Sequence, residues 1–176
     1  MCQSIESIWA LSATDESRNY AKFALLNIVP SLVDSVESPS PANKEKMAIG
    51  AHFAGKAINI SKTTAPHAFS YFLTEKFGIP HGEAVGMNIS KFIEYNYEVL
   101  SENTINILFE VFGVTSKVHL INCIESIKSK LNLKLSVKDI NHPFSIDEYF
   151  ENINIERLQN NPKLVNLSEV RNLLFN

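Results

Sequence analysis

The amino-acid sequence predicts an all-α protein. Apolar residues recur every three or four positions through most of the chain, which is the spacing of one helix face. Serines precede many of these segments and glycines or prolines follow them, as they do at helix starts and ends. The few clusters of Val and Ile show no strand-like alternation of apolar and polar residues. With 176 residues, 45% of them hydrophobic, the chain is expected to fold as a single helical domain, 1–176.

The first predicted helices cover about the first 60 residues. Apolar periodicity begins at once with Ile5, and a capping-box-like pattern at 12–15 predicts a second helix that Pro30 interrupts. The Ser- and Pro-rich stretch 35–40 is expected to be a loop. Ser40, as N-cap before a proline, then opens a helix to about residue 58. The small residues of this helix predict close packing: Ala48, Gly50, Ala51, Ala54, Gly55 and Ala57.

Further start and stop signals divide the rest of the chain. Pro66 and Gly78 delimit one helix, and the next is expected from His81 or Gly82 to about residue 100. Helices over 104–112 and 116–131 follow, bracketed by serines and a glycine. In the tail, Ser145 and Ser168 are N-cap candidates. The Asn-rich stretch 141–161 is expected to be irregular and loosely packed.

Charge and cysteine content narrow the classes of function. The net charge is only −3, which gives no support to binding of nucleic acid or an anionic membrane and favours a small-molecule or protein partner. Cys2 and Cys123 have no paired spacing and are expected to be unpaired, as in a reduced cytoplasmic protein. The sequence has no run of 18 apolar residues, which is the pattern of a membrane span. Its N-terminus also lacks the basic segment followed by an apolar run that marks a secretory signal.

Two histidines are the strongest candidates for chemistry. The sequence has no Gly-x-Ser-x-Gly elbow, no Gly-x-Gly-x-x-Gly and no Walker pattern, so neither a serine hydrolase nor a dinucleotide site is expected in this chain alone. His67 and His81 open two successive predicted helices joined by a tight turn, and their imidazoles can converge on one divalent ion. Their 14-residue separation is no zinc-finger interval, so two structural histidines remain the alternative from spacing alone.

A family resemblance bears on this choice. The segment Pro66-His-Ala, followed by Gly-Ile-Pro-His-Gly-x-Ala-Val-Gly ending at Gly86, resembles the signature of the iron-containing alcohol dehydrogenases. The opening Cys2-Gln-Ser-Ile-Glu is similar to the family helix that reads His-Ala-Ile-Glu after an aspartate. The resemblance covers about 1–95. It implies a helical bundle like the C-terminal domain of the dehydroquinate synthase-like and iron-containing alcohol dehydrogenase fold, with a metal-binding part at about 1–97 and a helical tail at about 101–176.

The resemblance also implies which residues hold the metal. His67 and His81 match the two ligand histidines of the family's helical domain, and a third ligand histidine aligns with Gln3, a poorer ligand. The family's aspartate ligand would fall just before Met1, so we expect an incomplete ligand set. Tyr71 stands where many members have a proton-relay histidine, and it is the catalytic candidate. Gln at the third ligand position and the surrounding motif resemble a branch associated with phosphonoacetaldehyde-type or related small aldehydes.

Other polar residues could have either a functional or a purely structural role. Lys62, Thr63 and Thr64 are candidates for binding an anionic substrate group, or simply form a solvated loop. Glu6 orients a ligand or forms a helix-surface pair, and the surface pair is preferred. Core packing is expected for His52 and for an aromatic stripe on one helix face, formed by Phe69, Phe72 and Phe77. His119 and His142 are expected to have surface or capping roles.

The activity that the resemblance implies is NAD(P)-dependent alcohol and aldehyde oxidoreduction, with Fe²⁺ or Zn²⁺ polarising the substrate oxygen. The family binds the nicotinamide against an N-terminal α/β domain, so we expect that nucleotide-binding domain to be missing and the chain to be truncated and inactive alone. A small alcohol or aldehyde substrate and a homo-oligomer are expected. The alternatives are a glycerol dehydrogenase or dehydroquinate synthase relative, and a non-catalytic helical scaffold or dimerisation remnant whose two histidines point to different places.

Overall fold

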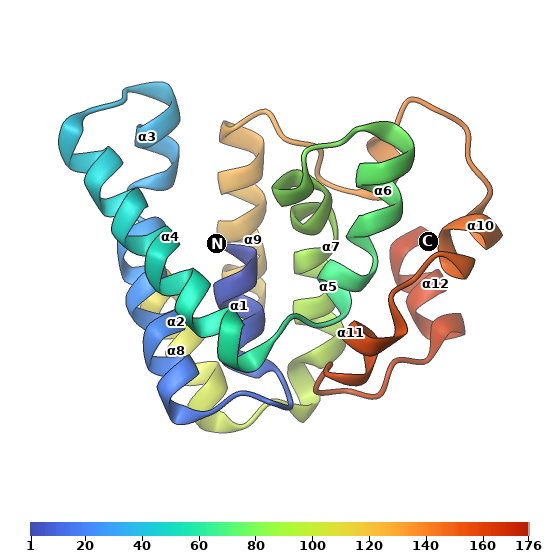
Figure 1. Cartoon of the computed structure of the whole chain (residues 1–176), viewed down its shortest axis with the longest axis horizontal. Coiled ribbons are helices and arrows are strands. Elements are labelled where there is room, and N and C mark those ends of the chain that lie inside the picture. Colours follow the sequence, from blue (N-terminus) through green and yellow to red (C-terminus); the bar gives the residue numbers. More distant parts are fainter. Residues whose placement is uncertain (176) are drawn as a thin grey trace.

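The all-α prediction is confirmed. The computed structural model describes residues 1–175, which form helices and connecting loops without a β-strand (Figure 1). The first half of the chain contains α1 Cys2–Trp9, α2 Asp15–Ile28, α3 Leu32–Glu37, α4 Pro41–Ser61, α5 Ala65–Ala68, α6 Ser70–Phe77 and α7 His81–Asn96. The second half contains the short 3-10 turn η1 Tyr97–Val99, α8 Glu102–Phe112, α9 Lys117–Lys130, the 3-10 turn η2 Val137–Asp139, α10 Ile146–Glu151, α11 Ile155–Gln159 and α12 Leu167–Phe175.

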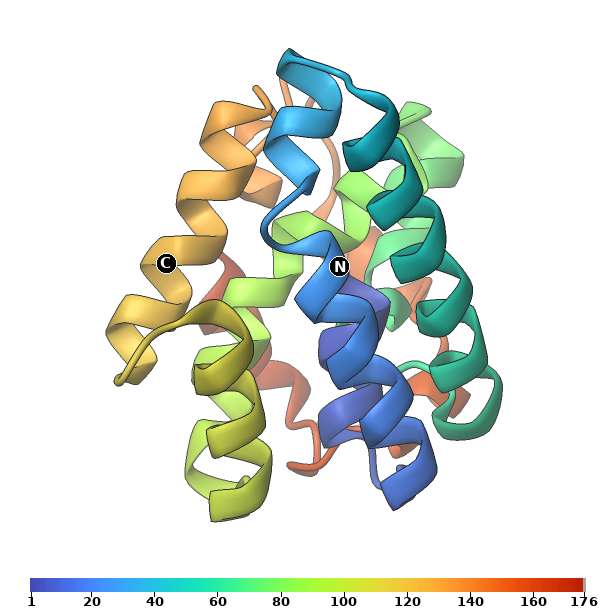
Figure 2. The same cartoon turned by 90° about the vertical axis from the view of Figure 1, so that its left-hand side faces the viewer.

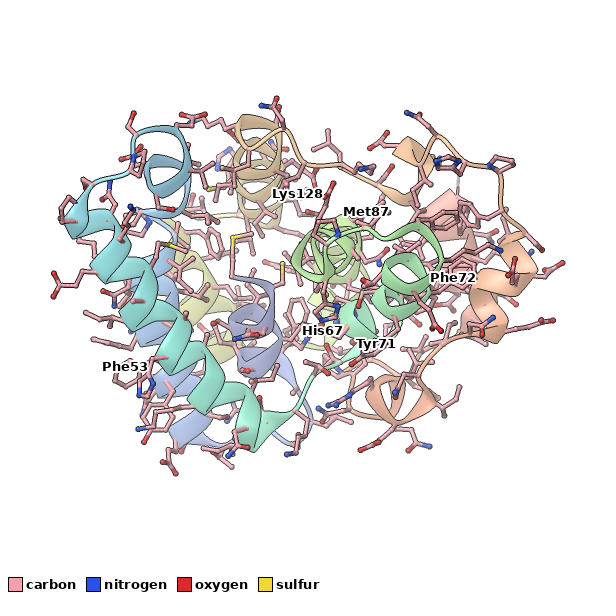
Figure 3. All side chains as sticks on the ribbon, turned by 45° about the horizontal axis from the view of Figure 1, so that its top comes forward. Phe53, His67, Tyr71, Phe72, Met87 and Lys128 are labelled. Carbon is pink, nitrogen blue, oxygen red and sulfur yellow. The ribbon has the colours of Figure 1, made fainter. Side chains whose placement is uncertain are left out.

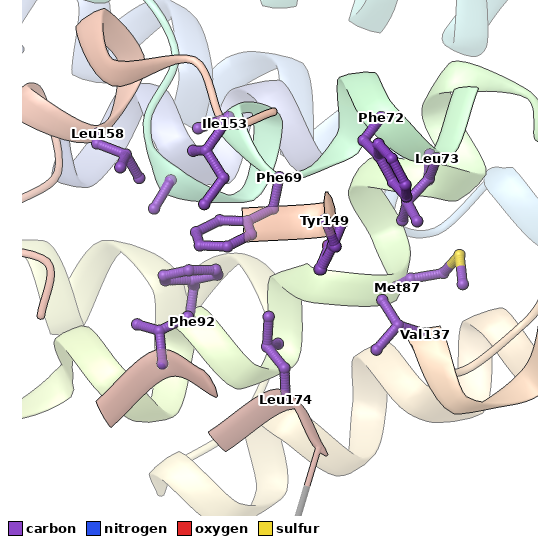
Figure 4. Close-up of a cluster of buried hydrophobic side chains, with 14 of the residues drawn as sticks. Phe69, Phe72, Leu73, Met87, Phe92, Val137, Tyr149, Ile153, Leu158 and Leu174 are labelled. Carbon is purple, nitrogen blue, oxygen red and sulfur yellow. The ribbon is translucent and has the colours of Figure 1, made fainter. Parts of the chain in front are cut away.

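Helix α7 lies between two hydrophobic cores and supplies side chains to both. On one side, Ile89 and Ile93 pack with apolar residues of α1, α2, α4, α8 and α9. On the other side, Met87 and Phe92 pack with residues of α5, α6, α10 and α12, as the close-up in Figure 4 shows. Both cores draw on the first and second halves of the chain. The two halves are therefore packed into one body, with α7 as its shared wall (Figure 1).

Helices α2 and α4 form the most extensive contact between two helices, and they run side by side in Figure 2. Gly50 is buried there, and an added Cβ would lie 2.5 Å from Cγ1 of Ile28. Close packing of small residues is thus confirmed for Gly50, Ala54 and Ala57. The other three expected there are exposed, because only every third or fourth residue of α4 faces the core: Ala48, Ala51 and Gly55.

Most of the predicted helix boundaries are confirmed by their caps. The side chains of four serines accept a hydrogen bond from the backbone N–H three residues on, as an N-cap does: Ser40, Ser101, Ser116 and Ser145. Gly78 and Gly113 end α6 and α8 with φ of 64° and 65°, the left-handed conformation that glycine adopts without steric cost.

Other boundary predictions were wrong. The expected loop 35–40 begins with the last turn of α3, whose first residues Leu32 and Val33 pack against the core. The capping box lies on Thr14 and Ser17, two residues later than expected, because the Ser12 hydroxyl binds Asn160 instead. The expected helix 66–77 is interrupted at Phe69, where the Ser70 hydroxyl donates a hydrogen bond to the carbonyl oxygen of residue 67.

The tail corrects two further predictions. Ser168 lies inside α12, and Asn166 caps that helix by accepting the N–H groups of residues 168 and 169 at 3.0 and 3.2 Å. The stretch 141–161 is not loosely packed throughout, because Tyr149 is fully buried against Phe69, Phe72 and Phe175. Asn161 is also buried and exchanges two amide hydrogen bonds with Asn96, of 2.7 and 3.1 Å.

His52 also departs from expectation. Its side chain is exposed, although a core position was predicted. The buried face of α4 carries Gly50 and Ala54, and a residue between them points about 200° away from each on a helix of 3.6 residues per turn. His119 and His142 lie on the surface as predicted, and His142 stacks on Phe77.

No single helix within 1–175 is long and apolar enough to cross a membrane, whereas α8 and α9, bent by 44° at their junction, satisfy the same length and composition test as a pair.

Candidate metal centre

The fold brings the two predicted ligand histidines together. His67 lies in the single turn of α5, and His81 is the first residue of α7. The left-handed Gly78 reverses the chain after α6, and buried Ile79 anchors the short connection to α7. The two imidazole rings consequently lie with their centroids 5.3 Å apart and their planes at 65°. Figure 3 shows His67 and the neighbouring Tyr71 near the middle of the molecule.

A cavity of about 260 Å³ opens beside the histidine pair, between α1, α7 and α9. His67, His81 and Gln3 all line it, so the three predicted ligands share one space. The rest of its wall is mostly apolar and includes Val85 and Leu131. Such walls lower the local dielectric constant and strengthen the interaction of any charge with the polar groups at the site.

Glu6 is the main correction to the sequence-based site. It was expected to form a surface pair, yet it is fully buried on α1 and its carboxylate Oε2 contacts Nδ1 of His67. The other oxygen, Oε1, accepts the backbone N–H of His67 at 3.2 Å, and Oε2 accepts the N–H of Thr64 at 3.5 Å. The pairing leaves Nε2 as the nitrogen of His67 that is free of this carboxylate. Residues 4–9 of α1 are all buried, which is why no surface remains for Glu6.

His81 has a more open environment. Its ring stacks on Tyr71, with centroids 5.7 Å apart and planes at 26°, and Tyr71 itself is 37% exposed. Partial desolvation lowers the pKa of the His81 imidazole, His67 lowers it further, and the Glu6 carboxylate opposes the shift. The neutral imidazole, which is the form that coordinates a metal, is therefore favoured at His81 near neutral pH.

Comparison with known proteins decides the family. The profile described as "Fe-containing alcohol dehydrogenase family, C-terminal" matches residues 1–175. The chain belongs to this family. Membership confirms the predicted resemblance and places the helical bundle in the C-terminal domain of the iron-containing alcohol dehydrogenases.

Relatives of the chain are reductases and alcohol dehydrogenases. It is 32% identical over 101 residues to the phosphonoacetaldehyde reductase of Streptomyces viridochromogenes, a match that covers 56% of this chain and 25% of the relative. It superposes with a TM-score of 0.90 and 25% identity on the sulfoacetaldehyde reductase of Bifidobacterium kashiwanohense, crystallised with NAD⁺, over 98% of this chain and 46% of that one. The alcohol dehydrogenase of Oenococcus oeni shares the fold, with a TM-score of 0.88, 19% identity and coverage of 98% and 48%. The chain thus spans less than half the length of these solved structures.

The three candidates for an anionic substrate group lie outside the cavity wall of this iron-containing alcohol dehydrogenase domain. Lys62 is exposed and donates to the carbonyl of Asn59. Thr63 and Thr64 are buried, and the hydroxyl of Thr64 accepts the indole N–H of Trp9 at 3.0 Å. Thr64 therefore fastens α5 to α1, and a substrate role for the three residues stays a prediction.

Two further residues of the cavity wall were missed. Lys128 is 2% exposed, and its ammonium donates to the carbonyls of Gly86 and Leu135 and pairs with Glu125. Its place on the apolar face of α9 was readable from the sequence, because it continues the i, i+4 series of Leu120 and Ile124. Cys2 also lines the cavity, and burial raises the pKa of its thiol, which keeps it protonated.

The donor set fits a divalent metal as a partial shell. No group of three or more His, Cys, Asp and Glu side chains able to hold a metal occurs within the described part, 1–175. The chain offers two imidazoles and the Gln3 amide, which are ligand types suited to Fe²⁺ or Zn²⁺. His67 already has the carboxylate partner that metal-bound histidines usually have on their other ring nitrogen.

Proposed function

We propose that this chain is the metal-binding half of an NAD(P)-dependent aldehyde reductase, in which His67, His81 and Gln3 hold Fe²⁺ or Zn²⁺. The observation that carries the proposal is the placement of the three residues around one cavity, with the two imidazole centroids 5.3 Å apart. On this proposal the nicotinamide is bound by a nucleotide-binding half outside these residues, and the chain alone does not turn over substrate.

Each residue of the chain has a defined task in this proposal. His67 is held by Glu6 and by the turn of α5, and His81 is supported by the ring of Tyr71 on one face. The apolar wall, which includes Val85 and Leu131, excludes water from the space beside them. When bound, the metal supplies a Lewis acid for the oxygen of the aldehyde or alcohol. Tyr71, beside His81 and open to solvent, is the candidate for proton exchange there.

The proposed substrate is a small aldehyde with an anionic group. This class is supported by the phosphonoacetaldehyde reductase of S. viridochromogenes and the sulfoacetaldehyde reductase of B. kashiwanohense, whose substrates differ only in that group. Lys128, the one lysine or arginine among the lining residues, is already engaged by Glu125 and two carbonyls. We therefore place recognition of the anionic group outside the cavity wall, with Lys62 and Thr63 as the candidates within this chain.

The alternative functions receive less support. A scaffold without chemistry would leave the two histidines pointing to different places, whereas their rings are in contact and share a cavity. A relative of glycerol dehydrogenase or dehydroquinate synthase is disfavoured by the match of 1–175 to the alcohol dehydrogenase profile. A homo-oligomer and a cytoplasmic location stay predictions.

Metal binding by the purified chain tests the proposal. Zn²⁺, and Fe²⁺ under anaerobic conditions, should bind with a stoichiometry close to one, and the combined substitution His67→Ala with His81→Ala should abolish this binding. His119→Ala with His142→Ala is a matched control, because it removes two exposed histidines that do not line the cavity. Equal binding by both double variants would refute the assignment.

The substrate class has its own test. Joining the chain to the nucleotide-binding half of the B. kashiwanohense reductase should give NADH oxidation with sulfoacetaldehyde or phosphonoacetaldehyde in preference to propanal. A chimaera that binds metal and prefers propanal would refute the anionic substrate class and leave the assignment of the metal ligands intact.

A further inference from the structure

We propose that Glu6 is a positioning residue that fixes the tautomer of His67, so that Nε2 is the nitrogen presented to a metal. The inference deepens the proposed function and rests on it. Its basis is the arrangement of donors around one buried carboxylate, at the junction of α1 and α5.

Three N–H groups converge on the Glu6 side chain. The backbone N–H of His67 donates to Oε1, the backbone N–H of Thr64 donates to Oε2, and Nδ1 of His67 contacts Oε2. Backbone N–H groups can only donate, so both oxygens are already placed as acceptors. An ionised carboxylate has no hydrogen to donate, so its contact with Nδ1 requires the ring hydrogen to be on Nδ1. A neutral imidazole with its hydrogen there has its lone pair on Nε2.

The carboxylate is held in place by its surroundings. Glu6 has no exposed surface, and its neighbours on α1 from Ser4 to Trp9 are all buried. The indole N–H of Trp9 donates to the hydroxyl of Thr64, which locks α1 to α5 one turn away from the carboxylate. A buried ligand partner of this kind limits the ring to one orientation and raises the basicity of the coordinating nitrogen.

Glutamine cannot replace this carboxylate. Its amide has one accepting oxygen and one donating NH₂ group, while the site requires acceptance from both the ring and the backbone N–H of His67. If the NH₂ group faces the ring, Nδ1 must accept and the hydrogen moves to Nε2, which then has no lone pair for a metal. If it faces the backbone, two donors oppose each other. Both outcomes weaken the site.

Two measurements on the 176-residue chain test the inference. Zn²⁺ affinity, measured by competition with a chelating indicator, should fall about 10- to 100-fold in Glu6→Gln. Glu6→Asp, which keeps a carboxylate on a shorter stem, should recover part of that loss. Ser4→Ala is the matched control, because Ser4 is fully buried on the same helix and its hydroxyl has no hydrogen-bond partner. Its affinity should equal that of the wild type.

The second measurement is the ¹⁵N NMR spectrum of His67 in the metal-free wild-type chain, which should show hydrogen on Nδ1 and none on Nε2. A folded Glu6→Gln variant with wild-type Zn²⁺ affinity, or a spectrum in which the neutral ring has its hydrogen on Nε2 and none on Nδ1, would overturn the inference while leaving histidine-dependent metal binding intact. A wild-type chain that binds no metal would overturn the proposed function, and the spectrum would then decide the role of Glu6 by itself. The spectrum likewise decides it if Glu6→Gln does not fold.

Discussion

Two glycines of α4 provide a matched pair for testing how tightly α2 and α4 are packed. Gly50 is buried against α2, and a Cβ there would lie 2.5 Å from Cγ1 of Ile28 and 3.1 Å from the carbonyl oxygen of Ala24. Gly55 is exposed on the same helix, and a Cβ there would meet nothing within 4 Å. Substitution of each by alanine changes helix propensity equally, so the difference between the variants isolates packing.

The magnitudes follow from these contacts. Gly55→Ala should raise the free energy of unfolding by about 0.5–1 kcal/mol, because alanine restricts the unfolded chain and favours the helix. Gly50→Ala has the same gain but adds a methyl group to a filled interface, at a cost of about 1–3 kcal/mol. The backbone carbonyl of Ala24 cannot move aside as a flexible side chain could. Gly55→Ala should therefore exceed Gly50→Ala by about 1–3 kcal/mol.

Urea denaturation followed by circular dichroism measures both values. In thermal melts, a difference of this kind shifts Tm by roughly 2–4 °C per kcal/mol for a chain of this size. If Gly50→Ala stabilised the protein as much as Gly55→Ala does, the α2–α4 interface would not be closely packed.

Two further predictions concern buried polar groups. Lys128→Met should lower the free energy of unfolding by about 2–4 kcal/mol, because it leaves the Glu125 carboxylate and two carbonyls without their shared donor; urea denaturation of the variant at a wild-type level would refute this. Burial raises the pKa of the Tyr149 hydroxyl, so the neutral form is favoured in the fold. Stability linked to Tyr149 should be constant at lower pH and lost as pH rises through the unfolded-state value near 10. Tyr149→Phe should lose less stability than the wild type between about pH 9 and 11, and equal losses would contradict the prediction.

Local chemistry explains which parts of the fold could be predicted from the sequence. Ser40, Ser101 and Gly113 act on backbone groups three or four residues away, so the helix ends that they set can be predicted from a few neighbouring residues. The resemblance around His67 and His81 is likewise carried by contiguous residues. These signals suffice for the order of helices and for the pairing of the two histidines.

Contacts between distant segments explain what was missed. The burial of Glu6 depends on α5 and α7, which lie about 60 or more residues further along the chain, and a short window around Glu6 shows only a charged residue on a helix. Tyr149 stands in a polar, Asn-rich stretch, and only the partners at Phe69 and Phe72 make it a core residue. Asn160 recruits Ser12 from the other end of the chain and thereby displaces the expected cap.

In the proposed site, His67 and His81 coordinate one metal ion. X-ray absorption at the zinc edge of the Zn²⁺-loaded chain tests it most directly, because imidazole ligands give a characteristic multiple-scattering pattern. We expect a first shell of nitrogen and oxygen at about 2.0–2.1 Å with two imidazoles, reduced by one imidazole in each of His67→Ala and His81→Ala. A shell with sulfur at about 2.3 Å, or one without imidazole scattering, would contradict it.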